Sequence, residues 1–107
     1  MKKHVGRIHR TMRGWRVNTI HVNRLRHTTV EWICRAAHRY VVVLPPFGRP
    51  LGKAAVVIPS HDGKASYKIR WTMIKKRRIA APYMILLEDG ETYRYVMGNS
   101  PPIIVLE

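Results

Sequence analysis

The sequence predicts an α/β (α+β) fold, in which a central mixed sheet is flanked by one or two helices. Three observations favour this fold. A basic segment without acids begins the chain, a stretch with helical spacing of apolar residues follows, and short apolar runs separated by Pro and Gly make up the rest. The length of 107 residues fits one domain. We therefore expect a basic N-terminal arm over residues 1–22 and a single α/β domain over residues 23–107.

The arm is marked by arginines that recur every three residues, at Arg7, Arg10, Arg13 and Arg16. The first 30 residues contain eight Lys and Arg and no acid. Glycines within the segment disfavour a helix, so we expect the arm to be partly extended. A solvated tail would also be polar, but the lack of any balancing acid favours an arm that binds phosphate.

Residues 23–39 are predicted to be helical, because Asn23 can cap a first turn and the apolar residues that follow fall roughly on one face. Three strands are expected next, over the runs "RYVVVL", "KAAVVI" and "ASYKIRW". The pair Asp62–Gly63 favours a hairpin turn between the second and third of these strands.

The stretch over residues 72–90 fits two interpretations. Ile79 and Tyr83 have the spacing of a helix, which would be the second helix of the domain. Pro82 and the pair Asp89–Gly90 also fit a strand that leads into a hairpin. The runs "TYRYVMG" and "IIVLE" are predicted strands joined by a turn at "NSPP".

The net charge of +14 indicates a polyanionic partner, and nucleic acid is the leading candidate. A membrane partner is not expected, since the longest apolar runs are far shorter than the ~20 residues of a spanning helix. No apolar segment follows Lys2 and Lys3, so no signal peptide for secretion is expected. The single Cys34 excludes an internal disulfide and multi-cysteine metal sites, and it fits an intracellular, reducing setting. We expect no cofactor.

The sequence does not predict an enzyme, and no metal is expected. The six acids are scattered along the chain, whereas two-metal hydrolysis needs several carboxylates that converge on one point. The six histidines show no zinc-ligand spacing with Cys34. A phosphate-binding glycine loop and a nucleophile elbow are also missing from the sequence. These observations favour a binding protein over a catalyst.

The candidate binding residues are two basic groups and one tryptophan. In "SYKIRW", alternation places Lys68 and Arg70 on the polar face of a strand whose other face is apolar, and "KKRR" follows shortly after. Trp15 is the candidate for stacking on a base, with core packing as its alternative role. No recognition helix, zinc finger or RNA-binding aromatic signature is visible, which favours sequence-independent binding through phosphates. The predicted phosphate contacts are Arg7, Arg10, Arg13, Arg16, Lys68, Arg70, Lys75, Lys76, Arg77 and Arg78.

Four short motifs resemble those of the RecB-like nucleases, in particular the CRISPR-associated exonucleases. The run "NRLRHTTVEWI" is similar to the family's helix with a histidine, and it places His27 at that position. The run "LGKAAVVI" is similar to the strand that begins Gly-x-x-Asp, with Ala55 at the metal-binding aspartate. The run "YKIRW" is similar to the strand with Glu-x-Lys, so Lys68 stands at the glutamate and Arg70 at the catalytic lysine.

The fourth motif, "IAAPYMILLED", is similar to a later helix of that family. It places Ile79 at the motif glutamine and Tyr83 at the tyrosine, while Pro82 departs from the pattern. The resemblance implies a restriction-endonuclease-like core that has lost its metal ligands and is catalytically inactive. It then implies a non-catalytic, sequence-independent DNA-binding and packaging protein, as in chromatin or a viral nucleocapsid.

The chain also resembles, more loosely, a nucleocapsid protein of rod-shaped viruses of hyperthermophilic archaea. This resemblance implies a protein of the virion, or one that is intracellular and associated with nucleic acid, and that self-associates along double-stranded DNA. The first alternative is a ribosomal or other structured-RNA-binding protein. The second is an active metal-dependent nuclease whose carboxylates the motifs do not reveal.

Overall fold

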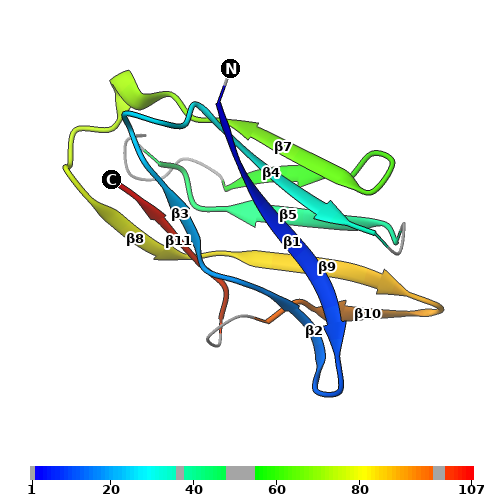
Figure 1. Ribbon diagram of the computed structural model, residues 1–107. Coiled ribbons are helices and arrows are strands. Elements are labelled where there is room, and N and C mark those ends of the chain that lie inside the picture. Colours follow the sequence, from blue (N-terminus) through cyan, green and yellow to red (C-terminus); the bar gives the residue numbers. More distant parts are fainter. Residues whose placement is uncertain (1, 36–37, 48–54, 98–100) are drawn as a thin grey trace.

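The computed structural model describes residues 2–35, 38–47, 55–97 and 101–107, and its regular structure is almost all β (Figure 1). The one helical element in these ranges is the short 3-10 helix η1 (Trp71–Met73). The predicted α/β fold with one or two flanking helices is therefore wrong. No helix among the described residues is long and apolar enough to cross a membrane.

The described strands form three sheets. The first sheet has the order β2 (Gly14–Val17), β1 (Lys3–Thr11), β4 (Thr29–Cys34) and β7 (Lys64–Lys68). The second has the order β10 (Thr92–Tyr95), β9 (Met84–Asp89), β5 (Tyr40–Leu44) and β6 (Val56–Pro59). The third has the order β3 (Ile20–Val22), β11 (Ile103–Leu106) and β8 (Ile79–Pro82). β1 is parallel to β4 and β3 is parallel to β11, while the other paired strands are antiparallel.

The three sheets enclose one hydrophobic core, because two stretches of chain pass directly from one sheet into the next. Two residues separate β2 from β3, and only Tyr83 separates β8 from β9, so each pair follows a nearly continuous bent path (Figure 1). The core contains Trp32 from the first sheet, Leu87 from the second and Ile104 from the third, all with no exposed surface.

Residues 23–39 contain a turn and β4 in place of the predicted helix. The Asn23 side chain does act as a cap, but of a turn, where its Oδ1 accepts a backbone N–H two residues on at 2.8 Å. Within β4, the buried side chains Val30, Trp32 and Cys34 alternate with residues on the outer face. This period of two is that of a strand. Val30 and Ile33 are three residues apart, a spacing that would place them on the same side of a helix. The helix prediction was wrong because in β4 they lie on opposite faces of the sheet.

The segment predicted to be an N-terminal arm is part of the folded body. β1 lies inside the first sheet, paired with β2 on one side and with β4 on the other (Figure 1). Gly6 and Ile8 are buried, whereas Arg7 and His9 are exposed on the other face. A Cβ atom at Gly6 would run into the Ile20 side chain, so this glycine lets β1 approach β3 closely.

The ambiguous stretch forms β8 and β9, so the strand interpretation is confirmed and the second helix is wrong. The other predicted strands are confirmed as β5, β6, β7, β10 and β11. β7 ends at Lys68, however, so Arg70, which was expected on the same strand, lies beyond it, and Trp71 begins η1. The turn at Asp62–Gly63 is confirmed, with φ angles of 52° and 78° at these two residues, and His61 and Lys64 form an isolated bridge across it. The predicted hairpin is wrong, because β6 and β7 belong to different sheets. The turn predicted at "NSPP" and the first residues of "KAAVVI" fall partly outside the described ranges.

The restriction-endonuclease-like core is contradicted by the same topology. Ala55 precedes β6, which belongs to the second sheet, whereas Lys68 ends β7 in the first sheet. His27 lies in the turn before β4, not on a helix.

Candidate nucleic-acid interface

The outer face of the first sheet gathers cations from three of its strands. Residues paired directly across neighbouring strands share a face of a sheet. Lys3 and Lys68 both pair with Thr29 of β4, one from each side. Arg7 and Lys64 flank Ile33 in the same way. We call this surface the basic face, and its cations are Lys3, Arg7, Arg16, Lys64 and Lys68, with His9 paired to Arg16.

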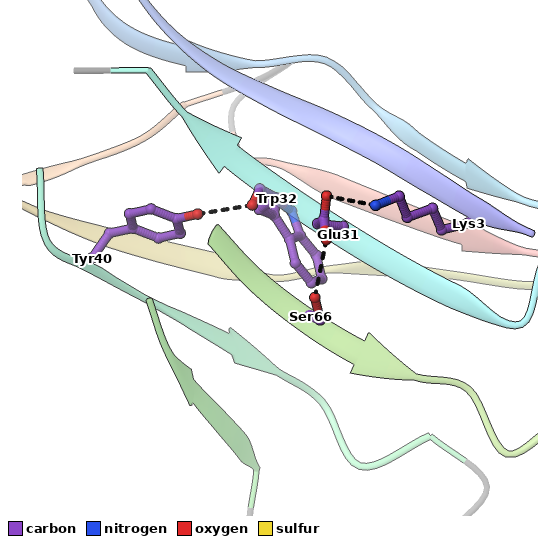
Figure 2. A network of polar contacts seen from close by, with 5 residues as sticks. All are labelled: Lys3, Glu31, Trp32, Tyr40 and Ser66. Carbon is purple, nitrogen blue, oxygen red and sulfur yellow. Dashed lines mark hydrogen bonds and ion pairs between the residues drawn. The ribbon is translucent and has the colours of Figure 1, made fainter. Parts of the chain in front are cut away.

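Glu31 is the only acid in these four strands, and it lies in the middle of the basic face. Lys3 Nζ lies 3.1 Å from Glu31 Oε1, and the Ser66 hydroxyl donates to Oε2 at 3.4 Å (Figure 2). The residue is 9% exposed. Its charge is thus balanced within the protein, and within the described residues no acid forms an ion pair with Arg7 or Lys68.

A buried polar network supports β4 beneath this face. The Tyr40 hydroxyl lies 3.0 Å from the Trp32 carbonyl oxygen (Figure 2) and 2.8 Å from that of Gly63. The Trp32 indole donates to the Tyr83 hydroxyl at 3.1 Å. Burial raises the pKa of Tyr83 to about 12 and raises the pKa of Tyr40 above its ordinary value. Both phenols therefore stay neutral and act as fixed hydrogen-bonding groups.

Arg70 is exposed and lies two residues beyond Lys68, the last residue of β7, at the start of η1. The Trp71 indole donates to the His27 carbonyl oxygen at 2.7 Å, which ties this segment to the turn before β4. The Arg24 guanidinium carbon lies 5.2 Å from the centre of the Trp71 ring, a cation–π contact. Lys68 and Arg70 are therefore held at one end of the first sheet.

The "KKRR" run lies outside the strands of the first sheet, in the loop between η1 and β8. All four residues are exposed. Arg24 donates to the Lys76 carbonyl oxygen at 3.0 Å, and Arg78 Nε lies 3.5 Å from a carboxylate oxygen of Glu107, next to β11. Lys75, Lys76, Arg77 and Arg78 thus form a second basic surface at the end of the third sheet.

Trp15 is a core residue in the structure. It is 5% exposed, and its indole donates to Asp89 Oδ2 at 3.2 Å. The Arg10 guanidinium carbon lies 6.0 Å from the centre of its ring. This burial favours the alternative role given to Trp15, core packing, because little of its ring is free to stack on a base. Arg13 lies in the turn between β1 and β2.

A hollow of about 580 Å³ lies between the β1–β2 hairpin and the edge strand β10. We call it the arginine hollow, and its lining includes Arg10, Arg13, Arg16, Arg94, Tyr93 and Tyr95. Sequence reasoning assigned the first three of these to an arm and missed the residues of β10. The signal for them was the run "TYRY", which is polar or aromatic at every position and fully exposed in the structure.

The six positions mapped to nuclease motifs do not form one cluster. Lys68 and Arg70 are exposed at the end of the first sheet, while Tyr83 is buried in the core. His27 accepts the backbone N–H of Asn23 on its Nδ1 at 3.0 Å. Ala55 is exposed before β6, and Ile79 begins β8.

Three histidines lie at the end of the first sheet where β1 begins. The His4 and His27 rings contact each other edge to face, with their centres 5.4 Å apart. Burial lowers the pKa of His4, and the charges of His27 and His21 lower it further. Within the described residues, no group of three or more His, Cys, Asp or Glu side chains is arranged to hold a metal ion.

A scan against models of known protein families finds no match to the chain, and a search of curated proteins finds no similar sequence. The resemblance to RecB-like nucleases stays a prediction from the four motifs.

Proposed function

We propose that this protein is a non-catalytic, sequence-independent DNA-binding and packaging protein that holds the phosphate backbone on its basic face. The observation that carries the proposal is the collection of five Lys and Arg on one side of the first sheet, where the only acid is already ion-paired. The net charge of +14 supports a polyanionic ligand, because such self-repulsion is relieved when phosphates neutralise it.

The spacing of the cations suits a duplex. Two strand intervals separate Arg7 from Lys64, about 10 Å, and four residue steps along β7 separate Lys64 from Lys68, about 13 Å. These spacings are close to the width of the major groove, about 12 Å. Cations on the face can therefore contact phosphates on both sides of a groove.

The composition of the face suits contacts to the backbone. Lys acts as a point charge and Arg can bind one phosphate through two N–H groups. The residues between the cations include Thr29 and Ser66, small hydroxyl side chains that do not reach far from the sheet. Contacts of this kind fix position on the duplex but carry no sequence information, which is what packaging requires.

The proposal is tested by removing charge from the basic face. In the triple variant Arg7→Gln, Lys64→Gln, Lys68→Gln, we expect weaker binding to duplex DNA and a salt dependence flatter by about two to three in log–log slope. The matched control removes the same charge from the second basic surface, as Lys75→Gln, Lys76→Gln, Arg77→Gln.

The control separates a binding face from a general effect of charge. We expect it to lose less affinity than the basic-face variant. Equal losses in the two variants would mean that binding depends on net charge alone, and the basic face would not be the site. Tighter binding of unaltered protein to a folded RNA than to duplex DNA would favour the structured-RNA alternative.

A further inference from the structure

We propose that the arginine hollow binds an unpaired nucleotide of a single-stranded segment, with its base stacked on Tyr93 or Tyr95. This inference rests on the proposed function, because the nucleic-acid strand that supplies the nucleotide is the polyanion that the basic face would hold. The hollow would give the protein a preference for unpaired bases, which contacts to the phosphate backbone alone do not give.

The first support is the charge of the hollow. Arg10, Arg13 and Arg94 form no ion pair within the described residues. The acid in the lining is Asp89, and one of its carboxylate oxygens already accepts the Trp15 indole N–H at 3.2 Å. Guanidinium groups bind phosphate through paired hydrogen bonds. An arginine-rich hollow of this kind is thus complementary to a phosphate.

The second support is the exposure of two aromatic rings that line the same hollow as these arginines. Tyr93 is 72% exposed and Tyr95 is 62% exposed, whereas the sheet's other tyrosine, Tyr40, is buried. β10 is an edge strand, paired only with β9 (Figure 1), so nothing on its free side covers these rings within the described residues. Tyr93 and Tyr95 are two residues apart and share a face of β10 with Glu88 and Leu86, about 7 Å from each other along the strand, while Arg94 between them lies on the other face. Two successive bases of an extended strand can stack on rings so spaced.

The third support is size and continuity. A volume of about 580 Å³ is in the range of small-ligand sites. Arg16 belongs to both surfaces, since it pairs with His9 on the basic face and also lines the hollow. A nucleic-acid strand that crosses the basic face can therefore enter the hollow while its phosphates stay next to positively charged residues. Bases inside a duplex are already stacked on each other, so only an unpaired base can use the tyrosines.

The experiment compares oligothymidine with a duplex of the same length as fluorescent probes. In the double variant Tyr93→Leu, Tyr95→Leu, we expect a loss of about tenfold or more in affinity for oligothymidine, the effect of losing one stacked base. Affinity for the duplex should stay the same. The double variant Tyr93→Phe, Tyr95→Phe keeps both rings and should bind oligothymidine as the unaltered protein does.

Three results would overturn the inference. The first is unchanged oligothymidine affinity in the leucine variant, and the second is an equal loss in the phenylalanine variant. Displacement of oligothymidine by polyglutamate at equal concentration would also overturn it, because the hollow would then select an acidic peptide. The basic-face variant Arg7→Gln, Lys64→Gln, Lys68→Gln reports on the proposed function separately. If the basic-face variant binds duplex DNA with unchanged affinity while the leucine variant loses affinity for oligothymidine, the proposed function is wrong. The assignment of a nucleotide site to the arginine hollow would then still be supported.

Discussion

Glu31 limits the positive charge of the basic face, because one buried carboxylate holds Lys3 in an ion pair. The Lys3 side chain is 50% exposed, so the pair adds little to stability. If the proposed function is right, its larger effect is on binding, since a lysine paired to a carboxylate is less available to a phosphate.

Glu31→Gln should tighten binding to duplex DNA and make its salt dependence steeper by about one in log–log slope, as one more phosphate is contacted. The measurement is a salt series of fluorescence anisotropy titrations. Asp62→Asn is the matched control, because Asp62 is an exposed acid in the β6–β7 turn. Weaker binding by Glu31→Gln than by the control would contradict this role.

The hydrogen bond between Trp32 and Tyr83 is a buried polar contact of the core. Tyr83→Phe would leave the Trp32 indole N–H without a partner, at a cost of about 1–3 kcal/mol in the free energy of unfolding. Urea unfolding measures this cost, and Tyr95→Phe, on an exposed tyrosine, should cost almost nothing. Equal stability of the two variants would show that the indole finds another acceptor.

At the scale of elements, the β6–β7 turn depends on the glycine at its second position. Gly63 has a φ of 78°, and a Cβ atom there would lie 2.8 Å from the Cys34 carbonyl oxygen. Gly90, in the β9–β10 turn, has a φ of 66° but open space around it. A substitution at either glycine would thus force a side chain into a left-handed backbone conformation. Only the substitution at Gly63 would also bring its Cβ atom too close to the Cys34 carbonyl oxygen.

Gly63→Ala should lower the free energy of unfolding by more than Gly90→Ala. The shared part, a left-handed conformation for alanine, costs about 1–2 kcal/mol. The collision with a backbone carbonyl adds to it only at Gly63, because the Cys34 oxygen cannot turn away without breaking the strand pairing of β4. Chemical unfolding of both variants measures the difference, and equal losses would mean that the turn relaxes around the new side chain.

The start of β1 makes stability depend on pH through His4. Its folded-state pKa is lowered by burial and by His27 and His21. The unfolded chain, with the ordinary value of 6.5, therefore binds the proton more tightly than the folded protein does. The contribution of His4 to stability is present above pH 6.5 and is lost as the pH falls through the lower folded-state value.

The melting temperature should thus fall on acidification below pH 6.5 and fall less in His4→Gln. His9→Gln, which removes an exposed histidine from the same strand, is the control. A profile for His4→Gln that matches the unaltered protein would contradict the assignment.

The elements that could be predicted from sequence are those with local signals. The run "YVVVL" is rich in β-branched residues and is followed by prolines. Asp62–Gly63 indicates a tight turn, because Asp and Gly tolerate the positive φ angles that such a turn needs. The helix over residues 23–39 was wrong because apolar residues on both faces of β4 imitate helical spacing. That distinction depends on what packs on each face, which is a tertiary property and has no local signal.

At the scale of the molecule, composition predicted the kind of partner, while the location of the candidate site needed the fold. Arg7, Arg16 and Lys68 were predicted contacts, but only the pairing of β1 with β4 and β7 sets them on one face. Lys64 and Tyr93 were missed because each looks like an ordinary strand residue until its neighbours are known. The nuclease motifs suggested a single cluster, which the division of β6 and β7 between two sheets contradicts.

The central claim is that the basic face binds duplex DNA through phosphates, without regard to sequence and without cleavage. The most direct test is the affinity of the unaltered protein for several unrelated duplexes across a salt series with magnesium present. We expect equal affinities, a log–log salt slope of about −4 from roughly four to five phosphate contacts, and intact DNA. A slope near zero, a clear preference for one sequence, or cleaved DNA would contradict it.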